Sequence, residues 1–289
     1  MVILELEREM AKQIDTMHMG RDRVICAWEA RPGVIVDPGP ASGIDAMLAG
    51  ATEEPRALLL THIHLDHAGA SGVLCRRFPD LRIYVHEVGA PHVIDPARLL
   101  VSAERLYGDQ MERLWGEVAP VPEDRVTTLA GGEEVEGLRV HYAPGHARHH
   151  VVYHDPHTGD VYTGDVAGVR VPPADLVAAP TPPPEIDVEA WLTSLAMLRE
   201  LDPNRICMTH FGAGDDPRHQ IDQVEAWLLE ASGRASGGDA DAFATWLDER
   251  FDAEGPEIAA RLRQAMPPDQ LWLGLERYWR KRREREAQA

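Results

Sequence analysis

Short apolar runs rich in β-branched residues recur along the chain as far as residue 212, and they predict strands. They occupy residues 23–30, 33–39, 57–62, 82–87, 137–145, 149–155, 160–166 and 205–212. Apolar residues at helical spacing predict helices over 67–78 and 187–201. The strands come in consecutive groups in both halves, with helices between some of them. This order favours two mixed sheets packed together, with helices outside, over a single parallel sheet.

Two further segments have helical patterns and look like additions to this sandwich. Residues 95–118 predict one or two helices whose apolar side includes Leu99, Leu100, Leu106, Met111, Leu114 and Trp115. From about residue 216 the pattern is helical to the end, where a charged run is typical of a solvated helix terminus. We therefore predict a main domain over 1–215, with an insertion at about 95–118, and a helical C-terminal subdomain over 216–289.

Composition narrows the classes of function. The formal net charge of −19 over 289 residues argues against a nucleic-acid partner, because phosphates require a basic surface. No apolar run approaches the ~20 residues that span a bilayer, and the opening residues MVILELEREMAK do not resemble a signal peptide. The three cysteines are too widely spaced to predict a disulfide framework. We expect a cytoplasmic protein that acts on a small molecule and has no membrane partner. Whether it forms a homodimer stays open.

Residues that can bind metals gather where the predicted strands end. The stretch THIHLDHAG, residues 61–69, holds three histidines and an aspartate, and a further histidine or aspartate ends each of APGH, YTGD and CMTH. The candidate ligands are His62, His64, Asp66, His67, His146, Asp165 and His210. Imidazole and carboxylate without thiolate suit zinc, iron or manganese. His62 and His64 project to the same side of extended backbone, whereas Asp66 and His67 follow where the chain turns into a helix.

The series THxHxDH, GH, TGD and TH resembles the metallo-β-lactamase superfamily over about residues 20–212. The resemblance implies an α/β (α+β) fold, an αββα sandwich of two mixed β-sheets flanked by helices, here with a helical C-terminal extension. Residues 1–215 would be its catalytic domain. It also implies two divalent metal ions, most simply Zn²⁺, with Fe or Mn as alternatives. Position by position, the first metal would be held by His62, His64 and His146, the second by Asp66, His67 and His210, and both by Asp165. Asp37 would be a buried support for the histidine loop.

Such a site implies a dinuclear hydrolase. Two divalent metals ~3.5–4 Å apart can share a water and lower its pKa from ~16 towards ~7, and the bridging hydroxide then attacks a carbonyl or phosphoryl group. Asp66 would orient that hydroxide or accept its proton while also binding metal, which makes it the candidate catalytic residue. No nucleophilic side chain is needed.

The choice of substrate rests on less specific segments. HLDHAGASG and the C-terminal helices are similar to glyoxalase II, but the segment after Asp165 lacks a basic, aromatic pattern suited to glutathione. Lactonases of the acyl-homoserine lactone type place a tyrosine shortly after the bridging aspartate, where this chain has Val166, Ala167 and Gly168. The apolar, proline-rich stretch 171–184 suggests an uncharged or acyl-bearing substrate. We predict an ester or thioester hydrolase, with a lactonase or a mononuclear-iron persulfide dioxygenase as alternatives.

Other notable residues are assigned structural roles. We expect His150 to pack behind the ligands, and Cys207 to be a buried, inert thiol. His18, His86 and the other remaining histidines outside the 146–150 segment are interpreted as surface or loop residues. Tyr107, Met111 and Trp115 would either roof the site or pack in the core.

Overall fold

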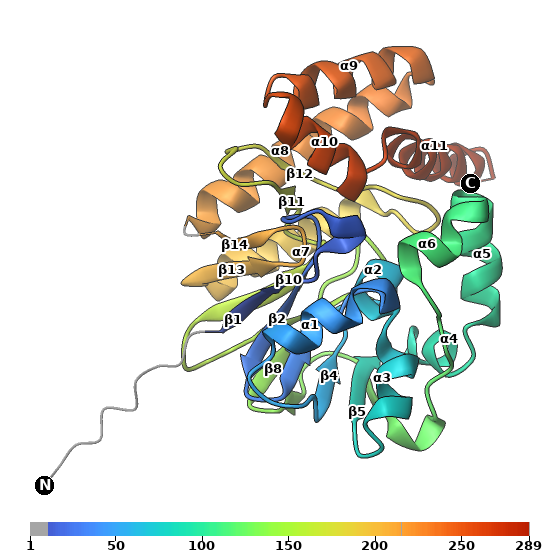
Figure 1. Cartoon of the computed structure of the whole chain (residues 1–289). Helices are drawn as coiled ribbons and strands as arrows, with labels where there is room; N and C mark the ends of the chain where they lie inside the picture. Colours follow the sequence, from blue (N-terminus) through green and yellow to red (C-terminus); the bar gives the residue numbers. More distant parts are fainter. Residues whose placement is uncertain (1–10, 215, 289) are drawn as a thin grey trace, which may run out of the picture.

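The computed structural model describes residues 11–214 and 216–288, and it contains two six-stranded sheets (Figure 1). The first sheet has the strand order β1-β2-β3-β4-β5-β6. Its strands are β1 (Lys12–Asp15), β2 (Cys26–Arg31), β3 (Val34–Val36), β4 (Ala57–Leu59), β5 (Arg82–His86) and β6 (Val126–Leu129). Pairs from β1 to β3 are antiparallel and pairs from β3 to β6 are parallel.

The second sheet has the order β14-β13-β10-β9-β8-β7 and is also mixed. Its strands are β14 (Gly212–Gly214), β13 (Arg205–Met208), β10 (Asp160–Gly164), β9 (Val151–His154), β8 (Leu138–Tyr142) and β7 (Glu134–Val135). Only β10 and β13 pair in parallel. A separate ribbon joins β11 (Val169–Arg170) to β12 (Val177–Ala178). The predicted pair of mixed sheets is therefore confirmed.

Three apolar clusters show how the layers are held together. One lies between the sheets, where Trp28 and Leu59 of the first sheet meet Val140, Tyr153 and Tyr162 of the second. The other two lie on the outer faces, beneath helices. Period-two alternation puts one side of each strand into the central cluster and the other into an outer cluster, which explains why the strands are apolar on both faces.

Helices flank both sheets. Helices on the first half of the chain are α1 (Ile44–Gly50), α2 (Leu65–Ala68), α3 (Ser71–Arg77), α4 (Ala90–Ile94), α5 (Ala97–Tyr107) and α6 (Met111–Trp115). The second half supplies α7 (Val188–Leu201), α8 (Pro217–Ser236), α9 (Ala240–Asp252), α10 (Pro256–Ala265) and α11 (Pro268–Glu286). Residues of α1, α3 and α4 pack on the first sheet, and residues of α7 and α8 pack on the second. The described helices include none that is both long and apolar enough to cross a membrane.

The predicted helix over 67–78 is wrong in detail, because the structure has two short helices, α2 and α3. The Ala70 N–H donates to the Gly39 carbonyl at 3.0 Å instead of continuing the helical ladder. A Cβ at Gly72 would lie 1.9 Å from the Ala119 carbonyl oxygen, so the glycine lets the second helix approach its neighbour. The break lets α2 carry its polar side chains towards the sheet edge.

The predicted insertion and C-terminal subdomain correspond to α5–α6 and α8–α11. Figure 1 shows α11 beside α5, although they are far apart in sequence. Residues of α8 and of the second sheet share one apolar cluster. The domain boundary between residues 215 and 216 stays a prediction. The opening stretch MVILELEREMAK was predicted not to be a signal peptide, and its residues 1–10 lie outside the described residues.

Candidate metal centre

The seven candidate ligands follow four strands and meet at one edge of the sandwich. His62 and His64 follow β4, and α2 carries the next two candidate ligands along the chain. The turn after β8 carries His146, while Asp165 follows β10 and His210 follows β13. The ends of neighbouring strands form a rigid edge where functional loops commonly lie. The chain thus brings together every residue that the sequence motifs singled out.

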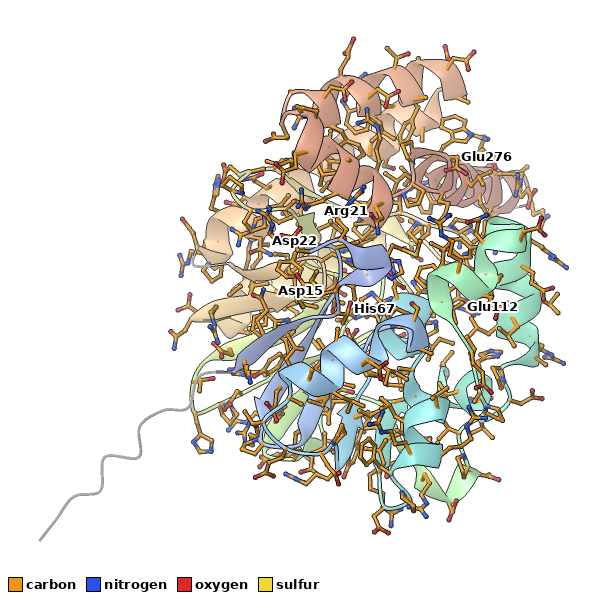
Figure 2. All side chains as sticks on the ribbon, in the orientation of Figure 1. Asp15, Arg21, Asp22, His67, Glu112 and Glu276 are labelled. Atoms are coloured by element: carbon orange, nitrogen blue, oxygen red, sulfur yellow. The ribbon has the colours of Figure 1, made fainter. Side chains whose placement is uncertain are left out.

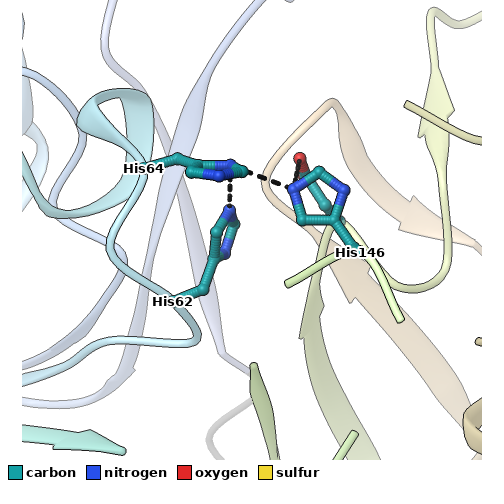
Figure 3. Close-up of side chains that lie close together, drawn as sticks. His62, His64 and His146 are labelled. Carbon is teal, nitrogen blue, oxygen red and sulfur yellow. Dashed lines mark hydrogen bonds and ion pairs between the residues drawn. The ribbon is translucent and has the colours of Figure 1, made fainter. Parts of the chain in front are cut away.

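The first group comprises His62, His64, His146 and Asp165, and its donor atoms lie within 4.8 Å of one another. Figure 3 shows how the rings of its three histidines face one another. The Nδ1 atom of His64 lies 3.0 Å from Nε2 of His62 and 3.0 Å from Nε2 of His146. Asp165 completes the group, because its Oδ2 atom lies 3.3 Å from Nε2 of His146. Three imidazole nitrogens and one carboxylate oxygen therefore converge on one point.

The second group comprises Asp66, His67 and His210, also within 4.8 Å. Nε2 of His210 lies 3.1 Å from Oδ2 of Asp66, and Nε2 of His67 lies 3.2 Å from Oδ1 of Asp165. The two oxygens of Asp165 thus face different groups, Oδ2 the first and Oδ1 the second. This division is what a carboxylate shared between two cations requires.

A buried aspartate fixes the orientation of His67, which is fully buried and labelled in Figure 2. Asp37 accepts a hydrogen bond from Nδ1 of His67 at 2.7 Å. It also accepts from the Thr61 backbone and hydroxyl at 2.8 and 2.7 Å and from the Thr209 hydroxyl at 2.9 Å. Because Nδ1 carries the hydrogen, Nε2 presents its lone pair to the second group. The carboxylate thus supports the histidine loop from beneath.

Backbone carbonyls hold two further rings in the same way. Nδ1 of His146 donates to the Pro180 carbonyl at 3.0 Å, and Nδ1 of His210 donates to the Val24 carbonyl at 2.6 Å. Nδ1 of His62 lies 3.1 Å from the Thr61 hydroxyl, which itself donates to a carboxylate and can therefore accept. In each ring the outer nitrogen carries the hydrogen and the inner nitrogen is left as a ligand atom.

These contacts fit a metal better than they fit hydrogen bonds. The bare Nε2 atoms of His62 and His146 both face Nδ1 of His64, whose single hydrogen cannot satisfy both at good geometry. Within the described residues, Nε2 of His67 and Oδ1 of Asp165 are buried without a hydrogen-bond partner. Cations at the two groups would satisfy all of these atoms.

Electrostatics distinguish the two groups. Burial lowers the pKa of His62 well below its usual value and lowers the pKa of His64 to about 4. Burial opposes protonation of His67 as well, but Asp165, Asp66 and Asp37 raise its pKa well above the usual value. The first group therefore presents neutral imidazoles that are ready to bind metal. The second is an acidic cluster that draws in positive charge, either a proton or a cation.

Two glycines permit the tight turns before ligands. Gly145 has φ 137°, and a Cβ there would lie 2.3 Å from Cα of Trp191. Gly164 has φ 49°, and a Cβ there would lie 2.3 Å from the Thr61 hydroxyl oxygen. Any side chain at either position would displace the following ligand, His146 or Asp165.

A pocket of about 310 Å³ opens above the centre. Four candidate ligands line this pocket, and we refer to them as its floor: His64, Asp66, Asp165 and His210. We refer to the lining residues of α5, α6, α10, α11 and the turn between α10 and α11 as its roof. The predicted insertion and the C-terminal helices both contribute to this roof. Tyr107 and Trp115 line the pocket, which agrees with the first of their two predicted roles, that of roofing the site. Met111 packs against the neighbouring apolar cluster instead.

The other histidines show what sequence alone misses. His150 is fully buried and stacks on His62 with ring centroids 4.8 Å apart. The interpretation of His18 and His86 as surface or loop residues is wrong, because both are buried. His18 stacks on Trp115 at 5.5 Å and His86 stacks on Tyr142 at 4.7 Å, so aromatic contacts across the fold cover them. Cys207 is buried, and this burial raises the pKa of its thiol well above the usual value.

Several supporting groups were assigned no role from the sequence. Thr209 and the carbonyls of Val24 and Pro180 hold the centre only because distant segments meet there. Gln270 of α11 accepts a hydrogen bond from the Tyr107 hydroxyl at 3.3 Å, which links the roof across 163 positions of sequence. Only the threonine preceding each histidine, Thr61 and Thr209, offered a repeated pattern that could have suggested a shared partner.

Comparison with known proteins places this geometry in a family. Residues 27–210 match the family described as the metallo-beta-lactamase superfamily. The chain is 31% identical over 163 residues to a metallo-beta-lactamase fold-containing protein of Sulfurisphaera tokodaii, which covers 54% of this chain and 60% of that protein. It is 32% identical over 134 residues to a hydroxyacylglutathione hydrolase of Thermosynechococcus vestitus, which covers 45% of this chain and 42% of the relative. The matches thus span about half the length of these curated relatives.

The fold match extends further along the chain than the sequence matches. A metallo-beta-lactamase family protein of Thermus thermophilus has a TM-score of 0.61 at 21% identity, over 89% of each chain. At 21% identity this similarity shows a shared fold and nothing about function.

Proposed function

The chain belongs to the metallo-β-lactamase superfamily, and from this premise we propose that it is a dinuclear metallohydrolase that cleaves a carboxylic ester or thioester of a small molecule. The observation that carries the proposal is the pair of ligand groups that share Asp165 on the floor of a pocket. The Thermosynechococcus vestitus relative is named for hydrolysis of a thioester, hydroxyacylglutathione, and this supports the choice of bond.

Divalent ions held by the two groups would supply a hydroxide at neutral pH and would polarise a carbonyl oxygen. His62, His64, His146 and Asp165 would hold the first ion. The second would be held by Asp66, His67, His210 and the same Asp165. Zn²⁺ is the simplest occupant of such a nitrogen and oxygen set, and Fe or Mn would also be bound by it.

The protein's own residues supply orientation and proton transfer. Asp37 and the Pro180 and Val24 carbonyls hold three rings rigidly, so the reacting atoms meet a fixed set of charges. Asp66 is the more open of the two carboxylates, with 21% of its side chain exposed against 5% for Asp165. It lines the pocket, so it is the carboxylate placed to accept or orient the proton of an attacking water.

The complete second ligand group favours dinuclear hydrolysis over the alternative of a mononuclear-iron persulfide dioxygenase. Asp66, His67 and His210 converge as closely as the first group does, and the orphaned Nε2 of His67 lies among them. A mononuclear enzyme would leave these three side chains, of which His67 and His210 are buried, without a second cation to balance them.

The proposal is tested by reconstituting metal-free protein with Zn²⁺, Mn²⁺ or Fe²⁺ and measuring metal content and hydrolysis on the same sample. The substrate panel contains thioesters, aryl esters, lactones and phosphodiesters. We expect about two metals per chain and the highest kcat/KM on a thioester or ester. One iron per chain with uptake of oxygen would overturn the proposal, and a preference for lactones would replace its substrate class.

A further inference from the structure

The roof of the pocket is apolar where it faces the floor. Leu99 and Leu106 of α5 line one side, and Leu271 of α11 lines another with the adjoining Met266. Prolines of the segment before α7, among them Pro182, close a third side. A volume of about 310 Å³ is at the lower end of the roughly 300–1,000 Å³ typical of ligand pockets. The space therefore fits a compact apolar group.

The roof offers little to an anion. Arg263 is the only lysine or arginine among the described residues that line the pocket. Its guanidinium is already paired with Asp248 at 2.6 Å and with Asp252 at 2.9 Å, both on α9. A carboxylate that entered the roof would lose its water without gaining a free cation, and such burial is costly.

The roof does hold an uncharged polar contact. The Tyr107 hydroxyl donates to Oε1 of Gln270 at 3.3 Å, so the inserted helix and the C-terminal helix meet through two neutral groups. Burial raises the pKa of Tyr107, which keeps the hydroxyl neutral. Both side chains line the pocket. Neutral hydrogen-bonding groups in an apolar wall orient a ligand without requiring it to carry charge.

We propose that the substrate of this hydrolase carries an uncharged, apolar acyl group of short to medium length, which occupies the space between floor and roof. This inference rests on the proposed function and specifies its substrate class. The acyl part is assigned to the pocket because the lining above the floor is mainly apolar and its single arginine is already paired. A large or charged leaving group, such as a peptide thiol, would not fit an apolar volume of this size and would lie outside it.

A matched substrate pair tests the proposal. The two are N-acetylcysteamine thioesters of hexanoic acid and of adipic acid, which share the scissile bond, the leaving group and the chain length and differ in the terminal carboxylate. We expect kcat/KM for the adipoyl thioester to be roughly 100-fold lower, because its carboxylate is desolvated without a partner. Between acetyl and hexanoyl thioesters, each added methylene should raise kcat/KM by about two- to fourfold. Equal rates on the pair, or no gain with chain length, would overturn the proposal.

Two arginine variants on one helix locate the effect. Leu106→Arg places a cation in the roof and should reduce the hexanoyl-to-adipoyl preference by at least about tenfold. Val101→Arg is the matched control, because Val101 lies on the same helix with 52% of its surface exposed and does not line the pocket. This control should keep the preference of the unmodified protein. An equal shift in both variants would show that the roof does not select the acyl group.

A binding measurement on metal-free protein separates this proposal from the proposed function. Hexanamide and the monoamide of adipic acid are titrated by calorimetry, so that neither hydrolysis nor a carboxylate bound to metal contributes. We expect hexanamide to bind at least about tenfold more tightly. If it does while no thioester, ester or lactone is cleaved by the metal-loaded protein, the proposed function fails and the pocket assignment stands. Hydrolysis combined with tighter binding of the acid would contradict the pocket assignment alone.

Discussion

The floor and the roof of the pocket are held in different ways. In the floor and the adjoining histidines, imidazole rings are held by hydrogen bonds from their outer nitrogens. Examples are Nδ1 of His67 to Asp37 at 2.7 Å and Nδ1 of His210 to the Val24 carbonyl at 2.6 Å. The roof helices instead pack by apolar contact, α5 in a cluster with Trp115 and α11 in the cluster of the second sheet, and a 3.3 Å hydrogen bond from Tyr107 to Gln270 links the two helices. Directional contacts fix reacting groups to within a fraction of an ångström, whereas apolar contact is non-directional and tolerates change. Changes in the floor should therefore alter chemistry, and changes in the roof should alter substrate choice.

The largest expected effect comes from removing a proposed ligand. His64→Ala should lose metal and reduce kcat/KM by more than the roughly 10–100-fold that outer partners typically cost. Its fold should persist, because the surrounding sheet core does not depend on this partly exposed ring. Metal content, circular dichroism and kcat/KM are compared with those of His219→Ala, which removes an exposed histidine on α8. Activity retained on the best substrate would refute the assignment of the floor.

The next effect concerns a positioning residue beneath the floor. Asp37→Asn should lower metal affinity and activity by about 10–100-fold, because an amide cannot accept all four hydrogen bonds that converge on the carboxylate. Chelator competition should show that one of the two metals is lost more readily than the other, since only His67 among the ligands contacts Asp37. The exposed Asp45→Asn on α1 serves as control. Loss of both metals together would mean that the two groups act as one unit.

The same contrast explains which features the sequence predicted. The sandwich and the ligand positions followed from apolar runs and from polar residues where those runs end, because period-two strands and close motif spacing are local properties. Edge strand β1 was missed, because in KQID only Ile14 is buried and no alternation marks it. The buried state of His18 and the link from Tyr107 to Gln270 depend on segments 97 and 163 positions apart. No local pattern encodes such contacts.

A smaller effect tests the electrostatics of His18, which lines the pocket and stacks on Trp115 of the roof. Burial lowers the pKa of His18 to about 4 from its ordinary 6.5. Between these values the unfolded chain binds a proton that the folded protein excludes, so stability falls as the pH drops from 6.5 towards 4. His18→Phe keeps an aromatic ring against Trp115 and removes this titration. At pH 5.5, relative to pH 7.5, the variant should gain about 1 kcal/mol over the unmodified protein in urea unfolding of metal-free samples. An unchanged difference between the two pH values would show that His18 is hydrated.

The smallest effect tests whether the polar link in the roof only positions the substrate. Tyr107→Phe removes the hydroxyl that donates to Gln270 and keeps the ring packed at 5.0 Å from Trp115. A hydrogen bond of this kind contributes about 0.5–1.5 kcal/mol, and its long distance favours the lower end. We therefore expect KM for the hexanoyl thioester to rise about two- to fivefold while kcat and metal content stay unchanged. If the variant instead turned over about 100-fold more slowly at saturating substrate, the hydroxyl would lie at the reacting carbonyl, and the division between a catalytic floor and a selective roof would no longer hold.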